Sequence, residues 1–312
     1  MRTAAFHHWL SRASDLTPSQ RQQARAWLRE NRPLDEVLAV IAGRPLSCPT
    51  CHHPRGVHWG SAHGLPRYRC RACHRTFNAL TGTPLARLRH RECWAAYAQA
   101  LLDGATVREA ARRCGIHKNT AFRWRHRFLS LPARSKPAHL HGIVEADETY
   151  FLESHKGERH LTRPPRKRGG VAAKRGLSRE QIPVLIARDR DRTTLDAVLA
   201  RADLRSVSAV LTPVIDPDAV LCSDGSALYR GFAQQAHLEH HPVNLRAGIR
   251  VVNHAFHIQN VNAYDSRLKG WMARFHGVAT RYLPTYLGWR RCLERFADHL
   301  TPSIFLAQAM GT

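Results

Sequence analysis

The sequence has no long apolar run. Its longest ones, such as VLAVIA at residues 37–42, are far shorter than the roughly 20 residues that cross a bilayer as a helix. The first 20 residues also lack the continuous apolar stretch of a secretory signal. We therefore expect a soluble intracellular protein with no membrane partner. In a reducing compartment its eight cysteines are not presumed to form disulfides.

Acidic side chains are the second scarcity. The chain has 24 Asp and Glu against 48 Lys and Arg, which gives a formal net charge of +24. Residues 1–142 hold 24 basic and 7 acidic side chains (+17), and the remaining residues hold 24 and 17 (+7). A front half this basic favours nucleic acid as the partner over an anionic membrane. The alternative is a merely cationic, solvated surface.

Turn residues and changes in the spacing of apolar residues divide the chain into segments. The front half is predicted to hold an N-terminal helical region at 1–45 with helices at 16–30 and 34–43, a Cys/His-rich segment with a small hairpin at 46–90, and a helical segment at 91–130. A linker at 131–142, an α/β domain at 143–300 and a C-terminal tail at 301–312 are predicted to follow. In the α/β segment, strand-like runs alternate with helix-like runs at 193–202 and 226–236. This alternation is typical of a mixed α/β fold.

Two cysteine pairs have the spacing of a zinc site. The pattern is C-x₂-C, 18 intervening residues and C-x₂-C, and it predicts four ligands: Cys48, Cys51, Cys70 and Cys73. Two thiolate pairs in tight turns complete a tetrahedron around zinc and leave room for a hairpin between them. Because four thiolates leave no open position, we expect a structural zinc ribbon. A dithiol redox centre, ordinary buried cysteines, or replacement of one ligand by His52, His53 or His74 are the alternatives.

Residues 103–129 have the pattern of a helix-turn-helix. Thr106 and Glu109 form a capping box, Gly115 permits the turn, and a second helix follows that is suited to the major groove. The predicted DNA contacts are His117, Lys118, Asn119, Thr120, Arg123 and Arg125. An ordinary helical hairpin is the alternative, which the surrounding positive charge disfavours.

Two aspartates, Asp147 and Asp224, lie in or directly after strand-like runs. Asp147 lies in the strand-like IVEADETYF, where alternation places it on one face with Glu145 and places Glu148 on the other. Asp224 lies where AVLCSDG leaves its strand. Carboxylates from neighbouring strands are suited to hold Mg²⁺, although a single Asp at a strand end is also common in turns.

The order of these features resembles a known family. Asp147, a second Asp after 76 intervening residues and a polar residue after 37 more follow the layout of ribonuclease-H-like nucleotidyl transferases. With the front half included, the chain resembles zinc-ribbon insertion-sequence transposases of the ISXO type, relatives of the DDE enzymes. The resemblance covers most of the chain and rests on these motifs in the family's order: CPTC…YRCRACHRTFNALTGTPL, ADETYFLESHKGERHLTRPPRKRGG, VLIARDRDRTT, LCSDGSALYRGF and HIQNVNAYDSRLKGWMARFHGVATRYLPTYLGWRR.

The resemblance implies a catalytic site with Asp147, Asp224 and Asn262 as ligands of Mg²⁺ or Mn²⁺, two ions in all. Asn262 stands where most DDE enzymes carry Glu, and its amide oxygen can still coordinate a metal. Competing candidates for the third ligand are Asp265, His254 and His257. Lys269, on the same helical face as Asn262, is suited to contact a phosphate of the bound strand.

A basic loop at 163–176 holds six Lys or Arg, including Lys167 and Arg168, and is either a phosphate clamp or a solvated tip. The whole pattern favours a bacterial transposase that acts in the cytosol on double-stranded DNA. It would bind the terminal inverted repeats of its element and cut and join strands as a homo-oligomer on paired ends. The alternatives are a DNA-binding regulator with an inactive catalytic domain, and a nuclease of the same fold that does not join strands.

Overall fold

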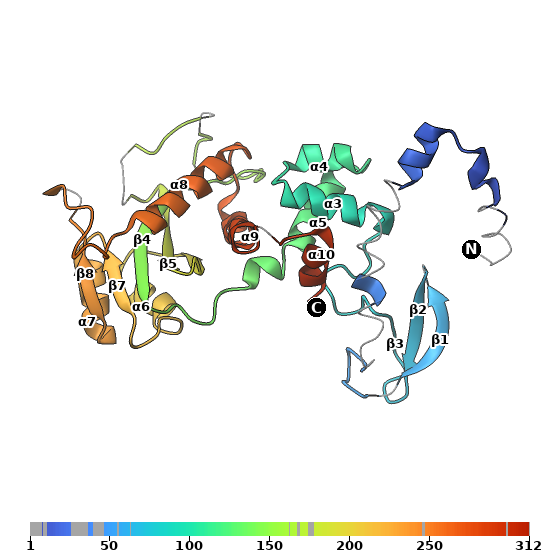
Figure 1. The fold of residues 1–312 in the computed structure, drawn as a ribbon, viewed down its shortest axis with the longest axis horizontal. Helices are drawn as coiled ribbons and strands as arrows, with labels where there is room; N and C mark the ends of the chain where they lie inside the picture. Colours follow the sequence, from blue (N-terminus) through green and yellow to red (C-terminus); the bar gives the residue numbers. More distant parts are fainter. Residues whose placement is uncertain are drawn as a thin grey trace. The chain divides into compact units, whose positions relative to one another are not determined.

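The structure, a computed structural model, describes residues 8, 11–25, 37–39, 47–54, 56–62, 64–161, 163–166, 169–173, 178–244, 247–297 and 299–311. Two compact units form the chain (Figure 1). One contains the described residues up to Phe128 and those from Leu300 onward, and the other is Leu129–His299.

The first unit begins with a short helical region followed by a small antiparallel sheet. Of the helix predicted at 16–30, residues 16–25 are described, and the helix begins at residue 18. Of the helix predicted at 34–43, residues 37–39 are described and are helical; the other residues of these two predictions lie outside the described part. The sheet has the order β1-β2-β3, with β1 at Gly56–Ala62, β2 at Leu65–Cys70 and β3 at Thr76–Phe77. The β1–β2 pair is the predicted hairpin.

Three helices of the same unit form the predicted helix-turn-helix. They are α3 (Trp94–Leu102), α4 (Val107–Arg113) and α5 (Lys118–Phe128). The capping box is present, because Thr106 Oγ1 accepts from Glu109 N at 3.3 Å and a Glu109 oxygen accepts from Thr106 N at 2.7 Å. Gly115 has φ +61°, the left-handed conformation that the turn before α5 requires.

The C-terminal residues return to this unit. Residues 302–310, which lie in the predicted tail, form α10 (Pro302–Met310), and α10 packs against α3 and α5. Its N-terminus is capped by Thr301 Oγ1, which accepts from Ile304 N at 3.3 Å. Phe305 and Leu306 are fully buried, so hydrophobic burial accounts for the docking of this segment.

The second unit is built on a five-stranded sheet. Its strand order is β6-β5-β4-β7-β8, with β4 at Ile143–Leu152, β5 at Gln181–Asp189, β6 at Thr194–Val198, β7 at Val220–Ser223 and β8 at Glu239–Pro242. The pairs β6–β5 and β5–β4 are antiparallel, and β4–β7 and β7–β8 are parallel. This mixed sheet confirms the predicted ribonuclease-H-like class, with β4 at its centre.

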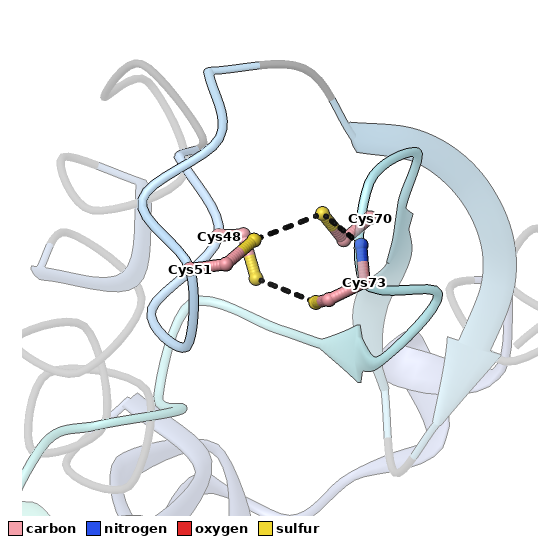
Figure 2. Close-up of side chains that lie close together, drawn as sticks. All are labelled: Cys48, Cys51, Cys70 and Cys73. Carbon is pink, nitrogen blue, oxygen red and sulfur yellow. Dashed lines mark hydrogen bonds between the residues drawn. The ribbon is translucent and has the colours of Figure 1, made fainter.

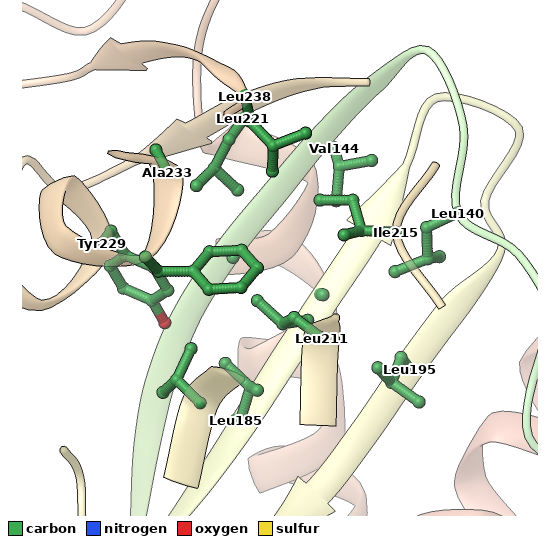
Figure 3. Packing of buried hydrophobic residues seen from close by; sticks show 14 of the residues in the cluster. Leu140, Val144, Leu185, Leu195, Leu211, Ile215, Leu221, Tyr229, Ala233 and Leu238 are labelled. Carbon is green, nitrogen blue, oxygen red and sulfur yellow. The ribbon is translucent and has the colours of Figure 1, made fainter. Parts of the chain in front are cut away.

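Helices cover both faces of the sheet. On one face, β4 residues Val144 and Ala146 pack in a core with α6 (Leu204–Leu211) and α7 (Ala227–Ala236), shown in Figure 3. Side chains alternate along a strand, so Glu145 and Asp147 point to the other face. There, α8 (Gln259–Ala273) packs on β4 and β5, and α9 (Leu283–Arg295) packs on β6.

One predicted helix is a strand. The run at 193–202 was expected to be helical, but residues 194–198 form β6, which pairs with β5 from Val184↔Val198 to Arg188↔Thr194. The edge of β5 supplied backbone partners that local helix preference could not outweigh. The helix of this region begins only at Leu204, after Asp203 caps it by accepting from Ser206 N at 2.8 Å.

The predicted linker at 131–142 is bound to the second unit at both ends. The guanidinium of Arg291 on α9 donates to Ala133 O at 3.1 Å and Ser135 O at 3.2 Å, and it also pairs with the buried carboxylate of Asp196. Gly288 lies so close that an added Cβ would meet Ala133 O at 2.3 Å. At the other end, Leu140 N donates to Val214 O at 2.7 Å.

Candidate functional site

Four cysteine sulfurs meet in the first unit (Figure 2). Cys48, Cys51, Cys70 and Cys73 have all their sulfurs within 4.8 Å of one another, and the neighbouring histidines do not belong to the group. The two turns that carry the pairs face each other, with Cys48 Sγ 3.6 Å from Cys73 Sγ and Cys51 Sγ 3.5 Å from Cys70 Sγ. The eighteen-residue separation therefore brings the pairs together, as the sequence predicts.

The geometry of this group fits zinc. Four sulfurs about 2.3 Å from a tetrahedral zinc ion are about 3.8 Å apart, close to the distances above. Backbone N–H groups also favour thiolates: although burial raises the pKa of Cys48, N–H donors from Cys51 and Thr50 lower it to about 6. The N–H of Cys73, opposed by burial and aided by Ala72, lowers the pKa of Cys70. The Cys₄ group can hold a metal ion.

The helix-turn-helix exposes most of its predicted DNA contacts. His117, Lys118, Asn119 and Arg123 are exposed on α5 and the turn before it, and Thr120 is half-buried. His117 Nδ1 accepts from Asn119 N at 3.3 Å, which orders the start of the helix. Trp124 faces inward against Tyr97 and Phe128. Four of the six predicted contacts thus lie on one accessible turn and helix surface.

Arg125 is a correction to the sequence analysis. It was expected to contact DNA, but its side chain is fully buried and its Nη2 donates to Ala105 O at 2.6 Å. It holds the loop between α3 and α4 against α5. Arg125 follows the core residue Trp124 and lies on the side of this amphipathic helix that faces the core. The backbone carbonyl oxygen of Ala105 compensates the buried charge of its guanidinium group.

The two aspartates come from adjacent parallel strands. β4 and β7 pair in register from Ile143↔Val220 to Glu145↔Cys222. Continued by two residues, this register places Asp224, just beyond β7, beside Asp147. Burial, followed by the charges of Glu148, Asp224 and Asp265, raises the pKa of Asp147 to about 7, although a hydrogen bond from the N–H of Glu148 lowers it. Asp224 itself is exposed and its Oδ1 accepts from Ser226 N at 3.0 Å.

Helix α8 carries the candidates for the third ligand. Asn262 and Asp265 are both half-buried and lie one turn apart on one side of the helix. Asp265 is near enough to act on the pKa of Asp147, its Oδ2 pairs with Lys269 Nζ at 2.8 Å, and its Oδ1 is buried with no hydrogen-bond partner among the described residues. The structure therefore brings this side of α8 to the Asp147 carboxylate.

The other candidates are placed differently. His257 lies 3.2 Å from a Glu145 oxygen and contacts Arg190, so its ring is held by that cluster. His254 is exposed in a turn with φ +59°. Lys167 and Arg168 of the basic loop lie outside the described residues. The cluster of Glu145, Arg190 and His257 was not singled out in the sequence, and only the alternation that puts Glu145 on the face of Asp147 points to it.

Among the residues that the structure describes, no helix has the length and apolar character that a membrane span requires.

We predict that loss of one thiol releases the metal of the Cys₄ group. Purified wild type should contain about one zinc ion per chain, measured by elemental analysis, because four thiolates form a closed tetrahedral site. Cys51→Ser should lose the zinc and become sensitive to proteolysis between residues 47 and 80, since metal binding supplies folding free energy here. Cys93→Ser is the control and should keep both zinc and protease resistance; equal zinc in Cys51→Ser would contradict the site.

We predict that Asp147 destabilises the metal-free protein at high pH. Its pKa rises from the ordinary 3.8 to about 7 on folding, so between these values the folded state binds more protons than the unfolded state. Stability then falls as pH rises from about 4 to about 7, by at most about 4 kcal/mol. With a chelator at pH 8, Asp147→Asn should unfold at a higher temperature than wild type, and the difference should vanish near pH 4. Asp218→Asn, which removes a carboxylate from an exposed position of the same unit, is the control for the loss of one charge; a pH-independent difference for Asp147→Asn would refute the burial argument.

Comparison with known proteins shows which domain families the chain resembles. Residues 139–290 match the ISXO2-like transposase domain, and residues 89–132 match a homeodomain-like domain. A protein of Halobacterium salinarum described as an uncharacterized protein in transposable element ISH50 is 27% identical over 267 residues, which cover 84% of this chain and 90% of the relative.

Solved structures give weaker likenesses. They include a simian T-cell lymphotropic virus intasome in complex with PP2A regulatory subunit B56 gamma (8% identity, TM-score 0.29, 66% of this chain and 69% of that one). They also include a pre-cleavage Mos1 transpososome (14% identity, TM-score 0.19, 66% and 79%). These scores are too low to bear on the argument. The two matched domains and the transposable-element relative, on a mixed α/β fold with a Cys₄ group, support an insertion-sequence transposase whose residues 139–290 are similar to the ISXO2-like transposase domain.

Proposed function

We propose that this transposase binds the terminal inverted repeats of an insertion sequence and catalyses metal-dependent cleavage and strand transfer of DNA. The observation that carries the proposal is the β4–β7 register, which brings Asp224, just past the end of β7, beside Asp147 within β4, together with the packing of α8, the helix that carries Asn262, on β4. Bound Mg²⁺ or Mn²⁺, two ions in all, would activate the attacking oxygen and stabilise the leaving oxygen of a phosphodiester.

The chain's own residues are suited to hold such ions. Asp147 and Asp224 offer carboxylate oxygens, and Asn262 offers an amide oxygen that adds no charge and cannot act as a base. Burial, and after it the charges of neighbouring carboxylates, raise the pKa of Asp147, and a bound divalent cation would supply positive charge to this group of carboxylates. We propose Asn262 over Asp265 as the third ligand because Lys269 already pairs with the Asp265 carboxylate. The Lys269 ammonium has three N–H donors, so it can keep its pair with Asp265 and donate another hydrogen bond to a phosphate of the bound strand.

DNA recognition is assigned to the first unit. The exposed residues of α5 would read base edges or phosphates in the major groove. The ribbon adds a second basic surface: no Asp or Glu occurs between Glu36 and Glu92, and Arg69 lies over the ring of Trp59 at 4.8 Å. Trp59 keeps half of its surface exposed, and Arg67 beside it donates to Thr76 Oγ1 at 2.8 Å. These cationic and aromatic side chains are suited to a nucleic-acid backbone.

We predict that Arg123→Ala weakens binding to an inverted-repeat end by about 5- to 150-fold, because a base or phosphate contact of an arginine is worth about 1–3 kcal/mol. The measurement is a titration of labelled end DNA at fixed salt. Arg201→Ala, which removes the same charge from an exposed position of the second unit, should leave the affinity within about twofold. Equal losses in the two variants would mean that net charge, not the α5 surface, determines binding.

We predict that strand transfer in vitro depends on all three proposed ligands. With a labelled inverted-repeat end, target DNA and Mg²⁺, wild type should join the end to the target. Asp147→Ala, Asp224→Ala and Asn262→Ala should each abolish joining by removing a metal-binding oxygen, whereas Asp265→Ala should be mild.

The outcomes separate the alternatives. Product that persists in Asp147→Ala would end the metal mechanism, and loss in Asp265→Ala but not Asn262→Ala would move the third ligand to Asp265. Cleavage without joining would identify a nuclease. Tight binding of the end without cleavage would identify a regulator with an inactive domain. Joining of two ends in one product would support the homo-oligomer on paired ends that this function implies.

A further inference from the structure

We propose that Glu145 is a positioning residue that fixes the N-terminus of α8 to the central strand β4 and thereby sets the position of Asn262 relative to Asp147. The inference rests on the proposed function, in which these two side chains hold metal together. Glu145 itself touches neither metal nor DNA in this account.

The contacts of Glu145 are directed at one point of α8. Its side chain is fully buried. One carboxylate oxygen, Oε2, accepts from the backbone N–H of Asn260 at 2.8 Å and of Val261 at 3.0 Å. The other, Oε1, accepts from Asn260 Nδ2 at 2.8 Å. The first N–H groups of a helix have no partner within it, and Glu145 supplies that partner from a strand 115 residues earlier.

Two cationic or polar groups complete the cluster. Arg190, just past the end of β5, has Nη1 3.0 Å from Glu145 Oε1 and donates through Nη2 to Ala255 O at 2.8 Å. His257 Nδ1 lies 3.2 Å from the same Glu145 oxygen. A buried carboxylate is tolerated only when hydrogen bonds and charge compensate it, so these groups are required for Glu145 to remain at this position. Arg190 also binds the loop before α8 to the sheet.

The far end of α8 is held by the chain that continues from β4. Lys156 Nζ donates to three carbonyl oxygens after the helix, Phe275 O at 3.2 Å, His276 O at 3.1 Å and Gly277 O at 2.8 Å. The anionic Glu145 thus lies at the positive end of the α8 dipole and the cationic Lys156 at its negative end. Each charge interacts favourably with the end of the helix that it faces. Residues 145 and 156 bracket Asp147 in sequence, so one segment fixes both ends of the helix that faces it.

The hydrogen bonds of Glu145 connect the segment that carries Asp147 to the segment that carries Asn262. Asp147 lies two residues after Glu145 on the same face of β4, and Asn262 lies one residue after Val261. No shorter set of hydrogen bonds described for the site joins these two side chains. Mg²⁺ demands near-ideal octahedral distances of about 2.0–2.1 Å, so a small displacement of the α8 N-terminus lowers metal binding. Lys156, at the other end, has no such direct path to Asn262.

The test compares Glu145→Gln with Lys156→Met. Glu145→Gln keeps the volume and one oxygen acceptor but places an NH₂ group against N–H donors. Lys156→Met removes the contacts at the opposite end of the same helix. Three measurements are made on the full-length protein: amide hydrogen exchange of the metal-free protein, Mn²⁺ binding without DNA by electron paramagnetic resonance, and strand transfer.

For Glu145→Gln we expect faster exchange at residues 258–264, and Mn²⁺ affinity and strand-transfer rate both reduced about 10- to 100-fold, with affinity for end DNA unchanged. For Lys156→Met we expect faster exchange at residues 270–277 and Mn²⁺ affinity within about threefold of wild type. Glu145→Gln retains the volume and one acceptor oxygen, so it is expected to fold, whereas Glu145→Ala removes the acceptor of both the α8 N–H groups and Arg190.

The results distinguish two failures. Unchanged exchange at 258–264 in Glu145→Gln, or a Mn²⁺ affinity reduced no more than in Lys156→Met, overturns the positioning role even if wild type is active. If wild type neither binds Mn²⁺ nor transfers strands, the proposed function fails, and the exchange data alone then decide whether Glu145 holds α8.

Discussion

Buried and half-buried negative charge on one strand is the constraint around which the second unit is arranged. β4 lies at the centre of the sheet and carries Glu145, Asp147 and Glu148 within four positions. Carboxylates in such a place must be neutralised, hydrogen-bonded or protonated. Glu145 meets this requirement through hydrogen bonds and an ion pair, whereas the pKa values of Asp147 and Glu148 are raised.

Glu145 is fully compensated. Its oxygens are taken by α8 amides, Arg190 and His257, so its charge contributes to the docking of a helix. Asp147 is not: burial and neighbouring carboxylates raise its pKa to about 7. Burial likewise raises the pKa of Glu148, on the opposite face. An uncompensated carboxylate costs stability in the free protein, as expected for the cation-binding site proposed at Asp147.

In the first unit, the segment around the Cys₄ group is too small to form a hydrophobic core of its own. Among the described residues, the buried cluster around the Cys₄ group consists of Cys48, Cys70 and Phe77, with Tyr68 and Cys73 packed against it. So little apolar burial cannot balance the conformational entropy of ordering the segment, and a metal–thiolate site is the usual remedy. The helix-turn-helix beside it in sequence needs no metal, because Trp94, Tyr97, Trp124 and Phe128 supply an aromatic core.

Local sequence determined the features that depend on spacing alone. Paired cysteines, the capping box of Thr106 and the strand alternation around Asp147 could be read because each concerns residues close in the chain or ligands of one type. The family motifs extended this to the order of the whole chain. Tertiary structure decided the rest: β6 formed because β5 offered an edge, Arg125 is buried because its helix turns that side inward, and Glu145 meets α8 across 115 residues. These outcomes depend on contacts between backbone groups and charges that lie far apart in the sequence, and a local sequence pattern does not predict such contacts.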